Sequence, residues 1–427
     1  MYAGFGPYRA PSNPLPAGLL RPRPLSPLED CRPALETVLT QNLASLWYPG
    51  AIDEERGGYR GDMDAASRWR DNPLRYVVSQ SRTLWFFSAL ARSPYGDDRH
   101  LAAAAHGFRF LRERMWDSEH GGLFWSVDAT SGEVVNASKS LCGQGFALYA
   151  ICEYAFASKD PEAASFALEF FRHLEERYRD PEQAGYLEMF ERDFGRVPLW
   201  NAHEGVDSHD KTLGTHMHLL EAYTSLYRLT ADPDVRVRLE ELFHIERDVA
   251  YLPRHKTYAS EFRPDWTPVP RLFPQVSYGH DLESIWFLIE ASEALGVPIQ
   301  PDLVSYRAVF DSALGHAFDR RNGGFYLRGL TAGPALWRQK VRWVQAEALV
   351  AALRLFRLTN DPAYADCFVR TLDWVVTRQV DWRNGGWHWQ IAPNGRASGD
   401  KAGAWRSCYH EGRAMLHCLE LLAGRQK

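Results

Sequence analysis

Apolar residues recur at helical spacing along most of the chain. Positions i, i+3, i+4 and i+7 are apolar in one stretch after another, with breaks at Gly, Pro and Asp-Pro between them, which is the pattern of packed helices. Asp160-Pro161 and Asp361-Pro362 each place an N-cap acid before a proline at the first helical position. The spacing predicts twelve helices, over residues 35–48, 74–91, 98–116, 138–157, 161–179, 210–230, 234–249, 279–295, 302–318, 339–358, 362–379 and 403–423.

A glycine pair or near-pair followed by aromatic residues returns between these helices. The second glycines, at positions 58, 122, 185, 324 and 386, are separated by 64, 63, 139 and 62 residues, and His255–Phe262 occupies the place of a hidden copy in the long interval. Self-similarity at a fixed period is the signature of stacked structural units. Six units of helix, Gly-aromatic hairpin and helix predict an all-α fold, an (α/α)6 barrel of twelve helices with short β-hairpins at one end. The copies read Gly57-Gly58-Tyr59, Gly121-Gly122-Leu123, Ala184-Gly185-Tyr186, Gly323-Gly324-Phe325 and Gly385-Gly386-Trp387.

Alternate helices differ in composition. Odd-numbered helices carry a charged stripe, as in Leu168–Glu176, whereas even-numbered helices mix small, aromatic and isolated polar residues. Burying a polar group without a partner costs about 1–3 kcal/mol, so a ring of such groups predicts a polar pocket on the barrel axis, lined by the even-numbered helices. These polar residues are Gln80, Arg82, Lys139, Gln144, His216, His218, His280, Glu283, Gln345, Glu347, His410, Glu411 and Arg413.

Composition narrows the classes of partner. The 427 residues are 45% hydrophobic with a formal charge of −5, which gives no indication of a nucleic-acid surface. No apolar run approaches the roughly 20 residues of a membrane span. The repeat predicts one catalytic domain over 34–427, preceded by an extended tail over 1–33 that contains eight prolines and no signal-peptide pattern. Six cysteines without CxxC spacing favour reduced thiols and a cytoplasmic protein, and a homodimer is left open.

Four segments carry a family resemblance. They are Lys211–Tyr223 (KTLGTHMHLLEAY), Tyr278–Glu283 (YGHDLE), Trp343–Ala348 (WVQAEA) and Trp405–Arg413 (WRSCYHEGR). In this order they resemble signatures of the N-acylglucosamine 2-epimerase superfamily, nearest its cellobiose 2-epimerase and mannose 2-epimerase branch, over roughly residues 35–424. The resemblance implies an (α/α)6 barrel that epimerises or isomerises a free reducing sugar without a metal or a nicotinamide cofactor.

Histidine suits that chemistry. Inverting C2 of an aldose requires the open chain, because only the free aldehyde acidifies the C2 proton, which leaves to give an enediolate and returns to the other face. Imidazole, with an ordinary pKa near 6.5, can take and return such a proton. By resemblance, His280 and His410 are the acid/base pair, while His218 and Glu283 assist ring opening or orient the bases. His280 and Glu283 are three residues apart on one helical face.

The resemblance also implies supporting residues. Arg82 corresponds to an arginine near the sugar oxygens, where it would stabilise the enediolate charge. Glu347 is expected to anchor a sugar hydroxyl or a histidine. Three tryptophans offer flat faces to a pyranose ring: Trp343, Trp389 and Trp405. Four other histidines are interpreted as structural: His173, His216, His316 and His417.

Three positions depart from the family pattern. Gly214 stands where the sugar epimerases usually have asparagine, Arg342 stands where many relatives have the first tryptophan of a pair, and Glu411 stands where asparagine is common. These changes bear on substrate size and on the balance between epimerisation and isomerisation. They leave the proposed base pair in place.

Alternatives to a sugar 2-epimerase remain open. A mannose/fructose-type aldose–ketose isomerase shares the enediolate but returns the proton to C1. A glycoside hydrolase of the same barrel class would use two carboxylates, and a carbohydrate-binding protein would turn nothing over. No metal is expected, because His216-x-His218 has the wrong spacing for two ligands on one helical face. The carboxylates available to a hydrolase are Asp207, Asp210, Glu283, Glu347 and Glu411.

Overall fold

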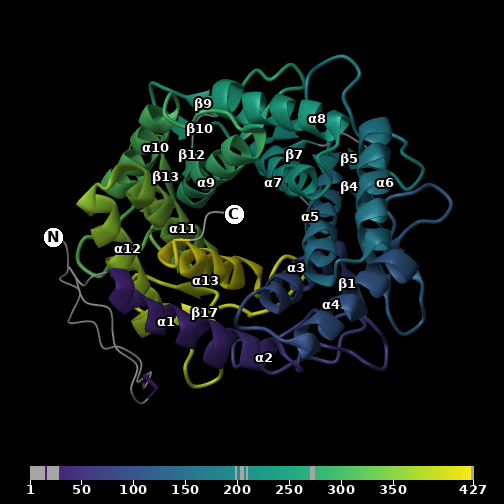
Figure 1. Ribbon diagram of the computed structural model, residues 1–427, viewed down its shortest axis with the longest axis horizontal. Coiled ribbons are helices and arrows are strands. Elements are labelled where there is room, and N and C mark those ends of the chain that lie inside the picture. Colours follow the sequence, from purple (N-terminus) through teal and green to yellow (C-terminus); the bar gives the residue numbers. More distant parts are fainter. Residues whose placement is uncertain are drawn as a thin grey trace.

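Two concentric rings of helices form the structure, a computed structural model that describes residues 15–16, 28–197, 200–201, 206–207, 210–269, 275–331 and 333–424. Each inner helix contacts the next, and the last contacts the first, so the inner ring is closed (Figure 1). The predicted (α/α)6 barrel is therefore confirmed. The inner helices are α3 (Val77–Arg92), α5 (Leu141–Ser158), α7 (Leu213–Thr230), α9 (Tyr278–Leu295), α11 (Arg342–Thr359) and α13 (Tyr409–Leu422).

Within the described residues, the outer ring has six helical runs, four of which contain a π-helical stretch. The first begins at Leu28 rather than at residue 35, because Pro33 occupies an early helical position that tolerates proline; the rest of the predicted tail, apart from residues 15–16, lies outside the described residues. The runs are η1 (Leu28–Cys31) with α1 (Arg32–Thr37), η2 (Val38–Ala44) and α2 (Ser45–Trp47); α4 (Asp98–Phe110) with η3 (Leu111–Met115); α6 (Pro161–Arg177); α8 (Pro233–His244) with η4 (Ile245–Ala250); α10 (Leu303–His316); and α12 (Pro362–Trp374) with η5 (Val375–Gln379).

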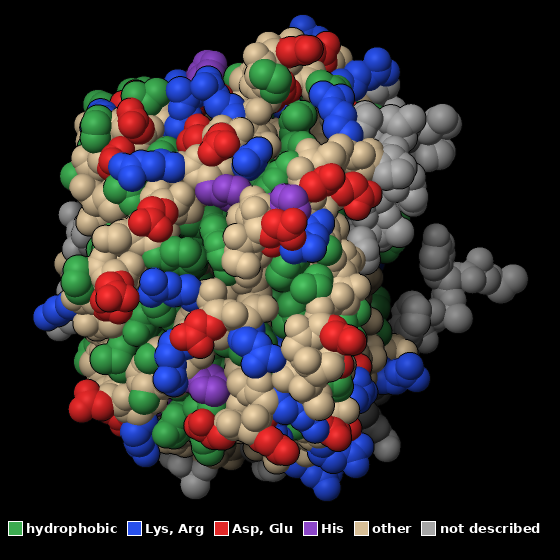
Figure 2. Space-filling model, turned by 90° about the vertical axis from the view of Figure 1, so that its right-hand side faces the viewer, with side chains coloured by type: hydrophobic (Ala, Val, Ile, Leu, Met, Phe, Trp, Pro, Cys, Tyr) green, Lys and Arg blue, Asp and Glu red, His purple; other side chains and the backbone are tan. Residues whose placement is uncertain are grey.

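The two rings bury different fractions of their surfaces. Helix α5 is buried at every position from Leu141 to Ala155, whereas α6 buries one stripe that includes Phe170 and Leu174. The charged stripes of the outer helices face solvent, and Figure 2 shows acidic and basic side chains interspersed on one side of the barrel. No helix among the described residues combines the length and the apolar character that crossing a membrane requires.

Short strands join neighbouring repeats at one end of the barrel. The strand before an inner helix pairs with the strand that follows the Gly-aromatic motif of the next repeat, and a bridge between Met63 and Ala402 closes the circle. These pairs are β1 (Leu74–Tyr76) with β2 (Ser126–Asp128), β4 (Lys139–Ser140) with β5 (Met189–Phe190), β8 (Lys211–Thr212) with β11 (Glu261–Phe262), β12 (Gln275–Ser277) with β13 (Arg328–Leu330), and β15 (Lys340–Val341) with β16 (Gln390–Ile391).

The remaining strands complete the hairpins. Residues Asp128–Gly132 and Ala392–Gly395 each form the turn between two paired strands, so the predicted short β-hairpins are confirmed at these two motifs. The strands are β3 (Val134–Asn136) beside β2, β14 (Ala335–Trp337) beside β13, β17 (Ala397–Ser398) beside β16, β9 (Tyr251–Leu252) with β10 (Thr257–Tyr258), and β6 (Trp200–Asn201) with β7 (Val206–Asp207).

Several inner helices begin later than their apolar spacing predicts. Helices α5, α7 and α11 start three residues late, because the residues before them form β4, β8 and β15. Each of these strands begins with a buried lysine that forms an ion pair with an aspartate before the glycine motif. Helix α13 starts at Tyr409 instead of residue 403. The segment displaced from that helix becomes part of the cavity wall described below.

The predicted ring of inward-facing polar side chains is only partly correct. Three glutamines each form two hydrogen bonds to the residue that follows the second glycine of a motif. The side-chain oxygen accepts from the backbone N–H of that residue, and the side-chain NH2 donates to its carbonyl, at 2.7–2.9 Å. These glutamines are Gln80, Gln144 and Gln345. His216 accepts from the Tyr186 N–H at 3.1 Å. These side chains satisfy buried hairpin groups that would otherwise lack partners, and they do not line the cavity.

The hidden sixth copy of the motif exists. Tyr258 pairs with Tyr251, as the residue after the second glycine of each other copy pairs across its hairpin, and Lys256, with a φ of +54°, stands in the place of the first glycine. Asp281 takes the role of the glutamine and accepts from the Tyr258 N–H. The sixfold repeat therefore places one inner-helix N-terminus beside each hairpin, at the end where the cavity opens.

Candidate active site

A cavity of about 650 Å³ lies at the hairpin end of the barrel. Its wall is formed by the N-terminal turns of inner helices and by the adjoining hairpins, and its volume is typical of small-molecule sites. Eight of the nine predicted site residues line it; the ninth, Glu347, lies behind His410. The lining residues from the prediction are Arg82, His218, His280, Glu283, Trp343, Trp389, Trp405 and His410.

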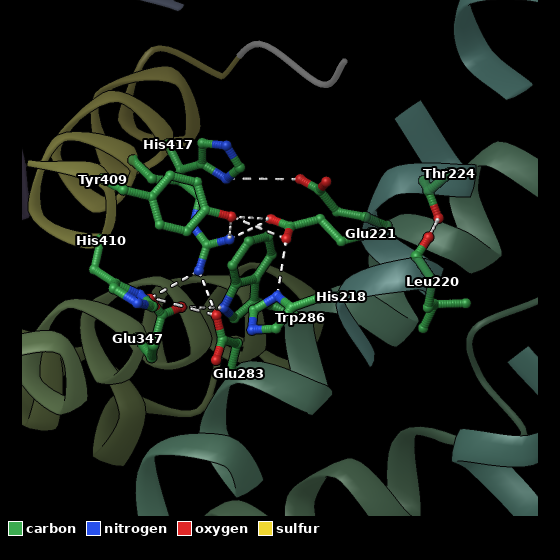
Figure 3. Close-up of polar contacts among 12 residues, drawn as sticks. His218, Leu220, Glu221, Thr224, Glu283, Trp286, Glu347, Tyr409, His410 and His417 are labelled. Carbon is green, nitrogen blue, oxygen red and sulfur yellow. Dashed lines mark hydrogen bonds and ion pairs between the residues drawn. The ribbon is translucent and has the colours of Figure 1, made fainter. Parts of the chain in front are cut away.

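His410 is oriented by a buried carboxylate. Its Nδ1 lies 2.7 Å from Glu347 Oε1, and the other oxygen of Glu347 accepts from Trp286 Nε1 at 3.0 Å (Figure 3). Because the carboxylate accepts, Nδ1 carries the hydrogen and Nε2 keeps its lone pair. Burial, with the nearby charges of Arg82 and Arg413, holds the pKa of His410 well below its ordinary value. The side chain is therefore a neutral imidazole at neutral pH and can accept a proton.

His218 has a second carboxylate partner that sequence reasoning missed. Its Nδ1 lies 3.2 Å from Glu221 Oε2, three residues along α7. Burial lowers the pKa of His218 well below its ordinary value, and burial raises the pKa of Glu221 to about 7 against the opposing charge of Arg413. The sequence does contain a pattern that could have indicated this contact, since His218 and Glu221 have the same i, i+3 spacing as His280 and Glu283.

One guanidinium joins the two histidine–carboxylate pairs. Arg413, 0% exposed, lies 2.9 Å from Glu347 and also contacts Glu283, Glu221 and the Tyr409 hydroxyl. Burial and the neighbouring Glu347 charge raise the pKa of Glu283 well above its ordinary value. Figure 3 shows the three carboxylates converging from α7, α9 and α11. Arg413 had been recognised only as a polar residue of an inner helix, because its role depends on how these helices face one another.

His280 and His410 flank the same indole. The centroid of the Trp343 ring lies 5.1 Å from that of His280 and 5.7 Å from that of His410. Gly279 permits this packing, because a Cβ there would come within 2.2 Å of the Trp343 ring. Burial, then the charges of His218 and Arg328, lowers the pKa of His280 to about 3. No hydrogen bond from a described residue engages its ring nitrogens, which remain available to a ligand.

His280 and Glu283, three residues apart on α9, do not contact each other. Among the described residues, no hydrogen bond or ion pair joins them, and Glu283 instead contacts Arg413 and lies 4.0 Å from His410 Nδ1. The i, i+3 spacing brings two residues to one side of a helix, but α13 supplies a charged partner that attracts the carboxylate away from its own helix. Glu283 therefore belongs to the His410 side of the cavity.

Arg82 and the tryptophans form the rest of the polar and aromatic wall. Arg82 donates to the Trp405 carbonyl at 2.5 Å and lies 4.1 Å above the Phe146 ring, while its Nε has no hydrogen-bond partner among the described residues. Trp389 and Trp405 line the cavity from outside the inner helices, since Trp389 directly precedes β16 and Trp405 lies in the segment before α13. A free N–H donor beside flat apolar faces is suited to a sugar ring.

The carboxylates available to a hydrolase are not arranged as an exposed pair. The side chain of Asp207 lies outside the described residues; of the other four candidates, Glu283 alone lines the cavity. Glu347 binds His410 and Arg413, and Glu411 lies 2.8 Å from the Arg342 Nε. Retaining and inverting glycosidases both need two carboxyl groups facing the scissile bond, and the described members of the predicted set do not supply such a pair, although Glu261 also lines the cavity.

Three potential metal ligands do come together. Ligand atoms of Glu283, Glu347 and His410 lie within 4.8 Å of one another, a cluster that spacing within single helices did not reveal. The same two carboxylates bind the Arg413 guanidinium, so the cluster already holds a positive charge. Metal independence therefore stays a prediction, to be tested directly.

An (α/α)6 barrel with imidazoles, carboxylates and indoles around one cavity defines a class of carbohydrate-active enzyme. The family model of N-acylglucosamine 2-epimerase matches residues 57–414, and the chain belongs to that family. It is accordingly an isomerase of the carbohydrate epimerase type.

Individual relatives agree with this placement. The chain is similar to a cellobiose 2-epimerase of Bacteroides fragilis, at 29% identity over 91% of this chain and 97% of that protein. It is also similar to a D-mannose isomerase of Thermobifida fusca, at 28% identity over 68% and 72% of the two chains. The solved cellobiose 2-epimerase of Spirochaeta thermophila superposes with a TM-score of 0.84 at 32% identity, over 93% of this chain and 98% of the other.

Proposed function

We propose that the protein interconverts glucose-type and mannose-type reducing ends, on cellobiose or on free mannose and glucose, by moving a proton at C2. The observation that carries this proposal is that His280 and His410 line one cavity and both contact the Trp343 ring. Two imidazoles around one ligand can reach opposite faces of a single carbon. The similarity to cellobiose 2-epimerases supports the same reaction.

The side chains suggest a sequence of steps. His218 and Glu283 assist opening of the pyranose, and one of the pair His280 and His410 then removes the C2 proton as the electron pair moves to the aldehyde oxygen. Arg82 stabilises the resulting enediolate. The other imidazole delivers a proton to the opposite face of C2, the carbonyl re-forms, and no oxidant or reductant is needed. The two imidazoles exchange roles in the reverse direction.

Glu347 stabilises the positive form of His410. Both histidines are neutral before substrate binds, so the one that protonates C2 must first acquire a proton. Glu283, whose pKa is raised well above its ordinary value by burial and by Glu347, lies 4.0 Å from His410 Nδ1, which already carries a hydrogen, so the proton that goes to C2 must reach Nε2 from the cavity side. The negative enediolate further stabilises an imidazolium beside it. His410, backed by the Glu347 carboxylate, is the better placed of the two to carry that positive charge.

Aldose–ketose isomerisation is the second candidate. Isomerisation passes through the same enediolate but returns the proton to C1. The similarity of this chain to a D-mannose isomerase supports isomerisation as the second candidate. The distinction depends on where the returning acid lies relative to C1 and C2.

Heavy-water product analysis separates these reactions. The protein is incubated with mannose, glucose, cellobiose and N-acetylmannosamine in deuterium oxide, and the products are followed by proton spectra. Deuterium at C2 of an aldose product supports epimerisation, a ketose product supports isomerisation, and new reducing ends indicate hydrolysis. Recovery of every sugar unchanged and unlabelled would contradict all three.

Matched histidine variants identify the proton-transfer groups. His280→Gln and His410→Gln should each lower C2 exchange by about 10²–10⁴-fold, the usual contribution of a general acid or base. His316→Gln, at an exposed position on outer helix α10, is the control. Exchange at wild-type rate in either cavity variant would remove that histidine from the mechanism.

A further inference from the structure

The hydroxyl of Ser277 is buried beside the cavity without a hydrogen-bond partner. Ser277 lines the cavity, is 8% exposed and is the N-cap residue of α9, but its Oγ forms no hydrogen bond with any described residue. The N-cap residues of α5 and α7, Ser140 and Thr212, instead accept from N–H groups of their own helices. Since a buried hydroxyl without a partner is costly, Ser277 is placed to bond a group that enters the cavity.

The N-terminus of α9 opens at the same place. The first backbone N–H groups of α5 and α7 donate to a neighbouring hairpin, from Leu141 to Glu188 at 2.8 Å and from Leu213 to Ser260 at 3.0 Å. Within the described part of the chain, the first three N–H groups of α9, at residues 278–280, have no acceptor. Such groups, at the positive end of an 18-residue helix, form a site suited to an anion.

Arg328 adds a full positive charge to this region. It pairs with Ser277 across β12 and β13, and the side chains of directly paired residues lie on one face of a sheet, with Cβ atoms about 4.5–5.5 Å apart. Arg328 lines the cavity, is exposed, and forms no side-chain hydrogen bond or ion pair with a described residue. Its charge also reaches His280, whose pKa it helps to lower after burial and His218.

The cavity wall carries more positive than negative charge, although the whole chain has a formal charge of −5. Its described residues include four arginines and two glutamates. One arginine is paired with Glu411, and one glutamate contacts Arg413. A cleft with an excess of one charge concentrates ligands of the opposite charge. The groups that remain are Arg82, Arg328 and Arg406 against Glu261.

We propose that Arg328, Ser277 and the N-terminus of α9 form an anion site that binds a carboxylate or phosphate at C6 of the sugar, so that the preferred substrate is an acidic hexose. Guanidinium and helix N–H groups both donate to the oxygens of such anions. Ser277 stands three residues before His280, so the anion lies about one helical turn from the imidazole. Ring opening needs a free C1 and the reaction needs a hydrogen on C2, whereas C6 can carry a charge. This inference rests on the proposed function and names its substrate class.

Initial rates with mannose, mannuronate and mannose 6-phosphate test the preference. For at least one of the two acids we expect kcat/KM to exceed that of mannose by about 10–100-fold, the range of a charge-assisted hydrogen bond. The better acid shows whether the site takes a carboxylate or a phosphate. Added salt should reduce the difference, because Arg328 is exposed. Mannose transformed as well as both acids, or better, would overturn the anion site.

Arg328→Gln and Ser277→Ala assign the preference to these residues. Each should lower the ratio of kcat/KM for the better acid to kcat/KM for mannose, by about tenfold or more for Arg328→Gln, and Arg328→Lys should restore part of it. Arg321→Gln is the matched control, since Arg321 is exposed on the turn before β13 and does not line the cavity. An equal loss for acid and mannose would place Arg328 in the common reaction instead. An equal effect of Arg321→Gln would reduce the preference to the general charge of the surface, and either result would overturn the proposal.

Calorimetry separates failure of the anion site from failure of the proposed function. Wild-type protein that transforms none of the three sugars would overturn the function. Binding of mannuronate or mannose 6-phosphate to that protein, weakened about tenfold in Arg328→Gln, would still support the anion site. Absence of binding by both acids, or equal binding by wild type and variant, would overturn it. Thermal unfolding of each variant checks that it is folded, and Ser277→Ala provides the test if Arg328→Gln is not.

Discussion

Arg413 and Glu347 are in direct contact at 2.9 Å in the centre of the barrel. Glu347 also orients His410, and Arg413 also binds Glu221, the carboxylate partner of His218. The two histidine–carboxylate pairs therefore share one buried cation. A displacement of that cation would alter the orientation of both imidazoles, although it touches neither ring.

Arg413→Lys should lower kcat by about 10²-fold, a loss comparable to that seen when partners that orient active-site ligands are removed. A single ammonium cannot contact three carboxylates in the plane that the guanidinium spans. Breaking a buried ion pair typically destabilises a protein by about 3–5 kcal/mol, so unfolding in urea should be measured beside turnover. Arg354→Lys, at a buried ion pair outside the cavity, controls for general destabilisation. Unchanged kcat in a folded Arg413→Lys protein would show that the shared cation is not needed for positioning.

Glu347→Gln should reduce C2 exchange about 10–100-fold, by analogy with other orienting carboxylates. The amide can present its NH2 to His410 Nδ1, which favours the tautomer whose lone pair faces away from the cavity. The pH dependence of kcat should also change, because the positive form of His410 loses a negative neighbour. Wild-type exchange with an unchanged pH profile would limit Glu347 to a structural role through Trp286.

The fold could be predicted from the sequence because the repeats contain local patterns, such as helix starts and glycine turns, that can be recognised one by one. Asp160 and Asp361 accept from the N–H groups of residues 162 and 363 at 2.9 and 3.0 Å, as their Asp-Pro pattern predicts. The glycine motif identified even the copy that contains Lys256 in place of glycine. Errors arose at the starts of inner helices, where Lys139 and Lys340 pair as strands and bind aspartates from a neighbouring hairpin. Apolar spacing carries no information on those ion pairs.

The sequence predicted the residues that reach the cavity from a recognisable motif. It did not predict contacts that depend on a partner from another inner helix. His280 and His410 reach the cavity from the N-terminal turns of α9 and α13, as their motifs suggested. Glu283 contacts Arg413 and not His280. Glu221, which also contacts Arg413, was not predicted as a site residue. The rotation of one inner helix against the next decides both cases, and a single sequence does not specify it.

Glu246→Gln should stabilise the protein above neutral pH. Glu246 is 1% exposed and forms no ion pair among the described residues; burial raises its pKa to about 8. Because the folded pKa exceeds the unfolded value, its contribution to stability is fully present below about pH 4.5 and is lost as pH rises towards 8. Glutamine avoids this loss, so the variant should gain a few kcal/mol over wild type at pH 8 and almost nothing at pH 4.5.

Urea unfolding at the two pH values measures the difference. Glu240→Gln, on the exposed side of α8, makes the same chemical change where the carboxylate is already hydrated, and it should show no such dependence. An equal effect of Glu246→Gln at both pH values would mean that the carboxyl group does not change its charge on folding.

Turnover should survive removal of divalent cations. Glu283, Glu347 and His410 offer three ligand atoms within 4.8 Å, but two of these side chains bind Arg413, and a divalent ion there would have to compete with a fixed positive charge in a buried site. Dialysis against EDTA should leave kcat unchanged, and added Mg²⁺, Mn²⁺ or Zn²⁺ should not raise it. Activity lost to the chelator and regained with one divalent ion would replace the proton-transfer proposal with a metal-assisted one. If a metal does bind there, Arg413→Met removes the competing charge and should tighten metal binding measured by calorimetry. If the site binds no metal, calorimetry should detect no metal binding in either wild type or variant.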